Sequence, residues 1–485
     1  MILKLSKIWK KTSSGREESR ELETTAGGHS CPPHGGLENP PPGNRSRGAG
    51  DGQGAEGDSG ETWSMNWNAT NIPVADSKHF ETLNGLWTGK KKPFVEAGVI
   101  RNTNFTPSGV IDYSNVAYLQ VEERQLSKRR LEAGDIILER SGGGPKQPVG
   151  RVVFFDREDG DFSFSNFTSA VRVKDKATFD PQFVFYGLME LYQSGQTEDI
   201  QRRTTGIRNL DFTAYKERAR FPKIPLPEQK KIAHILSTVQ RAIEAQERII
   251  QTTTELKKAL MHKLFTEGLR HEPQKPTEIG PIPESWEVVE LGALAKVGNG
   301  STPKRSNEAY WEGGTIPWLN STKIHDRFIT EAHQFVTPQA VKECHLPKVS
   351  PNSLLIAITG QGKTLGNSAI TRIETCINQH LAYAQFYVAK VLPDFVLWFM
   401  QTRYDYLRSI AHGGGSTKGA LTCGFLKTLS IPVPSRVEQG EIVTTFQSLE
   451  DKQDFALRKQ AALHDLFRTL LHHLMTAQIR TQHFE

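Results

Sequence analysis

Two long amphipathic stretches constrain the fold of this chain more than any other feature of its sequence. The first runs from Ile224 to Gly268 and the second from Ile431 to Ile479. Both open with Ile-Pro-x-Pro, followed shortly by a Glu-Gln pair. Proline lacks a backbone donor and clashes with the preceding helical turn, so the chain enters each stretch extended, and the first helix is predicted to start near Glu228. Gly268 is expected to end that helix.

Apolar residues recur along both stretches at steps of three and four residues, which places them on one helical face. At ~1.5 Å per residue, about 40 residues form a rod of roughly 60 Å, which is too long for an ordinary globular helix. We therefore expect the two rods to pair, although each could instead be a core helix of a separate domain. Corresponding apolar positions lie 210 residues apart, as in the pairs Ile232 and Ile442, Leu236 and Phe446, and Leu264 and Leu474.

The two stretches belong to a duplication of half the chain. SLLIAIT (Ser353 to Thr359) stands where DIILER (Asp135 to Arg140) stands in the first half. PDFVLWFM (Pro393 to Met400) likewise stands where PQFVFYGLM (Pro181 to Met189) does. Elements that recur in the same order indicate two copies of one architecture.

Composition and pattern divide the chain into segments. Residues 1–64 are rich in glycine and proline with hardly any apolar periodicity, which predicts a disordered extension. Dense strand signals predict an α+β domain over residues 65–223, with strands at 135–140, 149–155 and 169–174 and a helix at 181–193. The remaining segments are a spacer helix over 224–270, a proline-rich semi-rigid linker over 271–285, a second α+β domain over 286–430 and a C-terminal spacer helix over 431–480.

The overall composition argues against several classes of protein. Of the 485 residues 37% are apolar, and the most apolar run, residues 391–400, is too short for a membrane span and contains Asp394. The N-terminus has no secretory apolar region, so a cytoplasmic location without a membrane partner is expected. Four widely spaced cysteines indicate neither a zinc site nor a disulfide framework. The net charge of +6 permits a polyanionic partner without requiring one.

A glycine-rich sequence in the second half, GQGKT (Gly360 to Thr364), ends like a nucleotide-binding loop. A Walker loop also needs glycine where Ala357 stands, so ATP binding is not expected. The first half has SGGGPK (Ser141 to Lys146) in the same place. Two interpretations remain open, namely a turn between strands and a basic loop that approaches a phosphate backbone closely. We find no signature of a methyltransferase, metalloprotease or hydrolase active site.

Basic and amide side chains gather in loops of both halves. Arginine and lysine hold phosphates or pair with guanine, and asparagine and glutamine pair with adenine, although each such residue taken singly is more often a solvated loop residue. The DNA-binding candidates in the first half are Lys90, Lys91, Lys92, Arg101, Asn102, Asn104, Lys146, Arg202, Arg203, Thr204 and Arg208. Those in the second half are Thr302, Lys304, Trp318, Asn320, Lys363, Asn367, Gln379 and Lys418. No metal site is expected.

From Leu83 to its end, the chain resembles the specificity subunit of type I restriction-modification enzymes. The resemblance rests on the tandem order of domain, helix, domain and helix, and on the motifs TGIRNLDF (205–212), GPIPESW (280–286), NGSTP (299–303), IPWL (316–319) and Asn378-Gln379. It implies an α+β fold with a pseudo-twofold internal repeat, in which two tandem target recognition domains are separated by two long antiparallel coiled-coil helices. Each domain then reads one half of a bipartite site on double-stranded DNA.

The resemblance also implies which chemistry belongs to other chains. Two modification subunits would dock on the helices and methylate adenine with S-adenosylmethionine, and restriction motor and nuclease subunits would cleave DNA with ATP and Mg. No cofactor and no catalytic residue is expected in this chain. One alternative is a self-contained methyltransferase or nuclease, which would act on DNA as the purified chain alone. Another is a coiled-coil interaction protein, which would retard no duplex.

Overall fold

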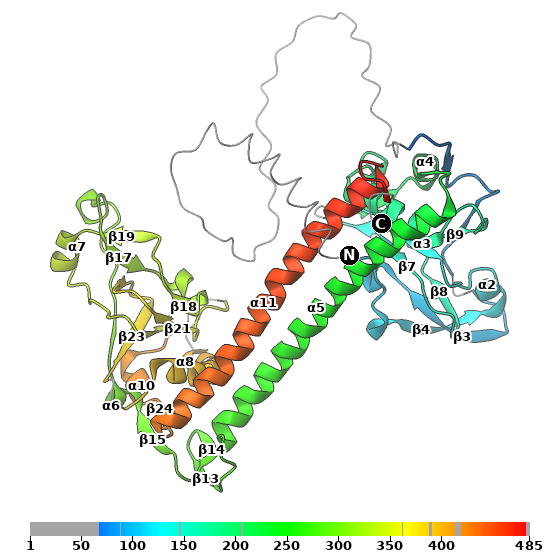
Figure 1. Cartoon of the computed structure of the whole chain (residues 1–485). Helices are drawn as coiled ribbons and strands as arrows, with labels where there is room; N and C mark the ends of the chain where they lie inside the picture. Colours follow the sequence, from blue (N-terminus) through cyan, green and yellow to red (C-terminus); the bar gives the residue numbers. More distant parts are fainter. Residues whose placement is uncertain are drawn as a thin grey trace, which may run out of the picture. The chain divides into compact units, whose positions relative to one another are not determined.

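The computed structural model of the chain describes residues 67–87, 89–144, 147–204, 207–360, 362–387, 390–412 and 419–481. The extension predicted over residues 1–64 lies outside this part. The chain divides into two compact units, of which unit 1 comprises Met1–Ala242 with Leu463–Glu485 and unit 2 comprises Ile243–Ala462. Each unit contains an α+β domain and a segment of both long helices (Figure 1).

The first domain, in unit 1, is built on a central antiparallel sheet with the strand order β2-β9-β5-β7. These strands are β2 (Phe80–Asn84), β9 (Thr168–Val173), β5 (Ile136–Glu139) and β7 (Val152–Phe154). A second sheet has the order β4-β3-β8, with β4 (Ala117–Glu122), β3 (Phe94–Ile100) and β8 (Phe162–Phe164). Smaller sheets join β10 (Gln201–Thr204), β11 (Ile207–Leu210) and β6 (Ser141–Gly143), and β1 (Asn71–Pro73) with β12 (Arg220–Pro222).

Helix α3 (Pro181–Gln193) packs behind this central sheet and confirms the predicted helix at 181–193. It begins there because Pro181 suits the first turn and the Asp180 carboxylate accepts a hydrogen bond from the Phe183 backbone. The strands predicted at 135–140, 149–155 and 169–174 are confirmed as β5, β7 and β9 with shorter or slightly shifted ends. Short helical segments are η1 (Asn102–Asn104), η2 (Tyr113–Asn115), α2 (Glu123–Ser127) and α4 (Phe212–Arg218).

The second domain, in unit 2, has a sheet of order β16-β23-β20-β21-β18. Its strands are β16 (Ala295–Asn299), β23 (Leu381–Phe386), β20 (Ser353–Ala357), β21 (Ser368–Thr371) and β18 (Phe328–Ile329). Further pairings join β19 (Gln334–Val336), β17 (Ile316–Leu319) and β22 (Cys376–Ile377), and β15 (Glu287–Glu290) with β24 (Ser430–Val433). The helical segments are α6 (Leu291–Leu294), η3 (Glu308–Tyr310), η4 (Ser321–His325), α7 (Pro338–Glu343), α8 (Pro393–Thr402), α9 (Tyr404–His412) and α10 (Cys423–Lys427).

The proline-rich segment between the first long helix and the second domain is more ordered than a linker. Strands β13 (Gln274–Thr277) and β14 (Gly280–Pro283) pair as an antiparallel hairpin. The prediction that prolines exclude a helix here is correct, but proline at these positions is compatible with a two-stranded ribbon in which every strand is an edge.

The long helices are α5 (Leu226–Glu267) and α11 (Arg436–Met475). Within unit 2 they run antiparallel, because Lys257 Nζ lies 2.6 Å from Glu450 Oε1 and Gln460 Nε2 lies 3.4 Å from Glu247 Oε1. This confirms the predicted pairing. Gly268 ends α5 with a φ of 66°, a left-handed conformation that glycine adopts without strain.

The glutamine of each Glu-Gln pair has the same structural function in both units. Gln229 is fully buried, and its amide binds the backbone of Asp180, Thr178 and Ile224. Gln439 is also fully buried and binds the backbone of Leu392, Lys390 and Pro434. Each glutamine therefore fastens the start of a long helix to the segment that leads into α3 or α8.

Candidate nucleic-acid interface

The glycine-rich sequences of the two halves occupy the same place in the fold. In the first domain, loop 1 (residues 140–151) connects β5 to β7, whose registers pair Ile136 with Phe154. In the second domain, loop 2 (residues 358–367) connects β20 to β21, which pair Leu354 with Ile370. Both loops thus link neighbouring antiparallel strands, as the first of the two open interpretations requires. The same position is compatible with the second interpretation, an approach to a phosphate backbone.

Loop 2 is held from one side by α9. The Tyr404 hydroxyl donates to the Lys363 carbonyl at 2.8 Å, and the Arg408 guanidinium donates to the Gly362 carbonyl. Asn367 Nδ2 donates to the same Lys363 carbonyl at 3.0 Å. Gly362 has a φ of 78°, which a side chain would strain. These contacts occupy loop carbonyls and leave the Lys363 side chain exposed to solvent.

Loop 1 is held at its base by a buried ion pair instead. Arg151 Nε and Nη2 lie 2.8 and 2.9 Å from the two carboxylate oxygens of Glu139, which is 1% exposed. Burial lowers the pKa of Arg151, but the hydrogen bonds and charge of Glu139 outweigh burial and raise the pKa overall. By strand register, Ala357 and Asn367 take these positions in the second domain. The two loops therefore share a location but not a mode of attachment.

Most of the DNA-binding candidates of the first domain lie on its accessible surface. Lys90, Lys91 and Lys92 are exposed just before β3, and Arg202 is exposed on β10. The side chains of Arg101, Asn102 and Arg208 are partly buried. Arg203 and Thr204 belong to strand β10. Lys146 lies outside the described residues.

The candidates of the second domain divide in the same way. Lys304, Lys363 and Gln379 are exposed, and Thr302, Asn320 and Asn367 are partly buried. The Thr302 hydroxyl and the Gln379 side chain are hydrogen-bonded to each other. Asn320 caps η4 by accepting a hydrogen bond from the Thr322 backbone at 3.0 Å. Lys418 lies outside the described residues.

Two candidates have a different environment from the others. Asn104 is fully buried, and its amide contacts the backbone of Arg101, Asp112 and Asn115 at 2.9 to 3.2 Å. Trp318 is 2% exposed and donates to the Ser301 carbonyl at 3.2 Å. Both side chains therefore bind the backbone of their own domain, and we do not assign them to the DNA interface.

The structure adds two arginines to the candidate residues. Arg140 is the first residue of loop 1, directly after β5, and its guanidinium lies 4.6 Å from the ring of Phe212 and donates to Asn84 at 2.9 Å. Burial lowers the pKa of Arg140. Arg327 precedes β18, and burial lowers its pKa to about 10, so it remains charged at neutral pH. The position of Arg140 next to the glycine run was a usable sequence signal, whereas nothing in the sequence distinguishes Arg327.

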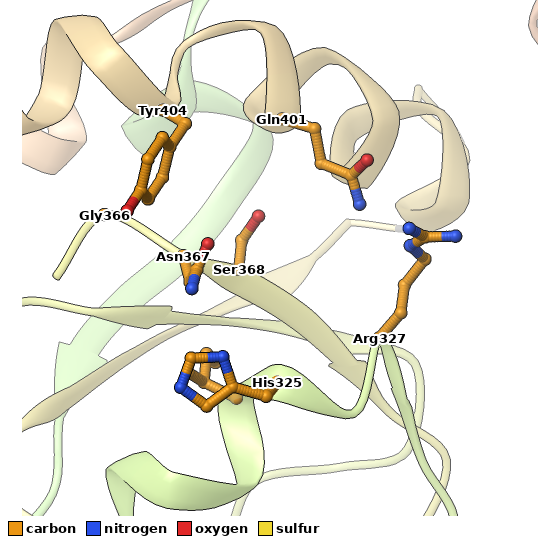
Figure 2. Close-up of a pocket in the computed structure, with 8 residues that line it drawn as sticks. His325, Arg327, Gly366, Asn367, Ser368, Gln401 and Tyr404 are labelled. Carbon is orange, nitrogen blue, oxygen red and sulfur yellow. The ribbon is translucent and has the colours of Figure 1, made fainter. Parts of the chain in front are cut away.

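Each α+β domain has a polar cavity next to its loop. The cavity of the first domain has a volume of about 330 Å³ and is lined by Asn84, Arg140, Arg202, Asn209, Leu210, Asp211, Phe212 and Thr213. The cavity of the second domain has a volume of about 340 Å³ and is lined by Ile324, His325, Arg327, Gly366, Asn367, Ser368, Gln401 and Tyr404 (Figure 2). Among the described residues, no three His, Cys, Asp or Glu side chains are grouped to hold a metal ion.

Comparison with known proteins identifies the family. The family model described as the type I restriction modification DNA specificity domain matches residues 74–254 and 283–464, which together make up more than half of the chain. The chain belongs to the type I restriction-modification specificity subunits. As a specificity subunit it determines the DNA target of a type I restriction-modification system and is non-catalytic. The two matched segments also correspond to the duplicated halves of the sequence.

Individual relatives support this membership. The provisionally assigned type I restriction enzyme MjaX specificity subunit of Methanocaldococcus jannaschii is 26% identical over 406 residues, which is 82% of this chain and 91% of that protein. The EcoR124I/EcoR124II specificity subunit of Escherichia coli is 26% identical over 191 residues, 37% of this chain and 46% of its own length. The crystal structure of the S subunit from M. genitalium, 18% identical, matches the fold with a TM-score of 0.54 over 85% of this chain and 98% of its own.

The comparisons confirm the predicted fold class of two α+β recognition regions with long helices packed together. No helix among the described residues of this specificity subunit is both long and apolar enough to cross a membrane.

Proposed function

We propose that each α+β domain of this specificity subunit reads one half of a bipartite site on double-stranded DNA. The observation that carries the proposal is the repeated position of the glycine-rich loop, which connects adjacent strands beside a polar, arginine-lined cavity in both domains. Polar side chains on loops that a rigid sheet holds in position are suited to contacts with bases and phosphates.

The interface proposed here comprises the candidates of both domains other than the buried Asn104 and Trp318, together with Arg140. Lysines and arginines are assigned to phosphates or guanine, and amides to adenine. In the first domain these are Lys90, Lys91, Lys92, Arg101, Asn102, Arg140, Arg202, Arg203, Thr204 and Arg208. In the second domain they are Thr302, Lys304, Asn320, Lys363, Asn367 and Gln379. Lys146, which belongs to loop 1, and Lys418 remain predicted DNA-binding residues.

Partner subunits supply the chemistry in this proposal. Two modification subunits dock on the paired helices and methylate adenine with S-adenosylmethionine, which requires the base to leave the duplex. Restriction motor and nuclease subunits use ATP and Mg to cleave. The specificity subunit contributes the choice of site and no cofactor.

An exchange of domains tests this division of labour. Residues 83–221 would be replaced by the corresponding domain of another family member, and the chain would be expressed with its modification subunits. Sequencing of methylated adenines should show one changed half-site and one unchanged half-site. A change in both half-sites would contradict independent reading, and methylation by the purified chain alone would contradict the assignment of catalysis to partners.

A further inference from the structure

The cavity of the second domain collects side chains from several segments that are distant in the sequence. Figure 2 shows them around one space beside the end of loop 2. His325 comes from η4, Asn367 and Ser368 come from the end of loop 2 and the start of β21, and Gln401 and Tyr404 come from α8 and α9. A cavity whose lining is almost entirely polar is suited to a polar ligand.

Two buried donors in this lining have no partner in the described part of the chain. They are Arg327 Nε and Ser368 Oγ. Buried polar atoms are nearly always hydrogen-bonded, so two such atoms in one cavity point to a ligand that accepts hydrogen bonds. The arginine is held in place because Nη1 of the same guanidinium pairs with Glu450, while the central carbon of the group lies 4.7 Å from the ring of Trp398.

The surroundings of the cavity favour a negatively charged acceptor. Arg327 lines it, and the exposed Lys363 lies on the adjacent loop. The nearby acids Glu450 and Asp326 already have cationic partners. Glu450 pairs with Arg327 and Lys257, and Asp326 lies 2.9 Å from Lys323 Nζ. Asp454, whose charge acts on Arg327, is exposed to solvent. An anion would therefore meet donors and positive charge, while these carboxylates are either paired or solvated.

We propose that this cavity binds one phosphate group of the DNA backbone, with Arg327 and Ser368 as donors. The proposal rests on the function proposed above, because loop 2 must lie on DNA for its neighbouring cavity to receive a phosphate. A tetrahedral phosphate presents oxygens to donors from several directions, as this lining requires. The contact fixes the position of the second domain on the duplex and carries no base sequence information.

A scan with neutral phosphate analogues tests the site in the intact complex. The chain would be assembled with its modification subunits and bound to duplexes that carry its methylated motif. Each duplex would have one methylphosphonate linkage at a different position around the second half-site. One linkage should weaken wild-type binding by roughly ten-fold, the effect of losing a charge-assisted hydrogen bond.

Two variants separate the site from general stability. Ser368→Ala removes only the hydroxyl, and Arg327→Gln removes the guanidinium while Glu450 keeps its partner Lys257. Both should bind the unmodified duplex more weakly and lose the additional effect of the sensitive linkage. Arg327→Gln should also lower the salt dependence by about one phosphate contact. Lys342→Gln on α7 removes an exposed charge from the same domain and serves as the control.

The outcomes distinguish the sources of the anion. Variants that keep wild-type affinity and wild-type sensitivity to every linkage would overturn the proposal. The proposal would also be overturned if the site bound only free anions. In that case inorganic phosphate would raise the melting temperature of the full chain, Ser368→Ala would lose this stabilisation, and no linkage would be sensitive. Failure of the proposed function would look different, because the wild-type complex would then show no preference for a methylated motif.

Discussion

The two units build the same junction between an α+β domain and the long helices from different chemistry. In unit 1, Tyr186 of α3 donates to Gln240 of α5 at 2.7 Å and packs edge-on against Phe467 of α11, with 6.1 Å between ring centroids. In unit 2 the corresponding position on α8 is Trp398, and the positions 210 residues from Gln240 and Phe467 are Glu450 and Lys257. A neutral junction in one unit is therefore a charged junction in the other.

The charged junction is more densely connected. Lys257 Nζ and the Arg327 guanidinium lie 4.9 and 4.7 Å from the ring of Trp398, and both cations pair with Glu450. In unit 1 the amide of Gln240 instead donates to the Ser108 carbonyl at 3.1 Å. The two copies therefore keep the same positions at the junction, but the charges of the residues at these positions differ. The two units should thus respond differently to mutation and to pH.

The largest expected effect is on unit 2. Glu450→Ala leaves two mostly buried cations without their carboxylate, which should destabilise unit 2 by about 3 kcal/mol. Hydrogen exchange of peptides from α8 and β18 would measure this loss, and peptides from α3 should be unaffected. Asp451→Ala, at the exposed next position, is the control. Equal losses in α3 and α8 peptides would mean that the two junctions are not separate.

A smaller effect is expected at the neutral junction. Tyr186→Phe keeps the ring but leaves Gln240 Oε1, in a side chain only 8% exposed, without the hydroxyl that donates to it. The expected cost is about 1 to 2 kcal/mol for unit 1. Hydrogen exchange of α3 peptides at two salt concentrations should show a loss that salt does not change. A loss as large as that of Glu450→Ala would remove the distinction between the junctions.

A pH response above pH 8 is expected at Lys257 of unit 2. Burial, followed by the charge of Arg327, lowers the pKa of Lys257 to about 8, and the charge of Asp454 opposes this shift only in part. In the unfolded chain the lysine pKa returns to about 10.4. Between these values the unfolded state binds more protons, so the stability of unit 2 should rise as pH increases above 8.

Urea unfolding at pH 7.5 and pH 9, followed by a probe in unit 2, would measure that rise. Lys257→Met should abolish the dependence because it removes the titrating group and leaves Glu450 paired with Arg327. Lys258→Met, one position further along α5 and exposed, should retain it. A wild-type unit 2 whose stability falls over this interval would contradict the assigned direction of the pKa shift.

The smallest expected effect is that of starting the chain at Met65. Arg480 pairs with Glu228 at 3.0 Å and lies 4.5 Å from the ring of Trp67 in unit 1, while Arg270 and Trp286 contact Glu438 in unit 2. A chain that starts at Met65 keeps Trp67 and should methylate normally. Trp67→Ala should instead destabilise unit 1, since Trp67 is 5% exposed. Loss of methylation by a folded, assembled chain starting at Met65 would assign residues 1–64 a function.

Local pattern was sufficient to predict the two long helices, α3 and the strands β5, β7 and β9. The apolar period of α5 and α11 and the N-terminal prolines are properties of neighbouring residues, so their lengths, pairing and approximate ends followed directly. The same holds for α3, whose capping residues Asp180 and Pro181 are adjacent to it in sequence. The family resemblance then supplied the functional class from motifs in order.

The availability of a polar side chain to a ligand could not be predicted from the sequence, because it depends on tertiary packing. Asn104 and Trp318 have the residue types of DNA contacts, yet the chain folds over them and satisfies their donors internally. Arg327 has no distinguishing sequence signal. Its partners are Trp398 of α8 and Glu450 of α11, both of which lie far from it in the sequence. Burial and pairing of this kind depend on how elements that are distant in the sequence pack against each other. The period of a helix and the duplication of the chain can instead be read from the sequence alone.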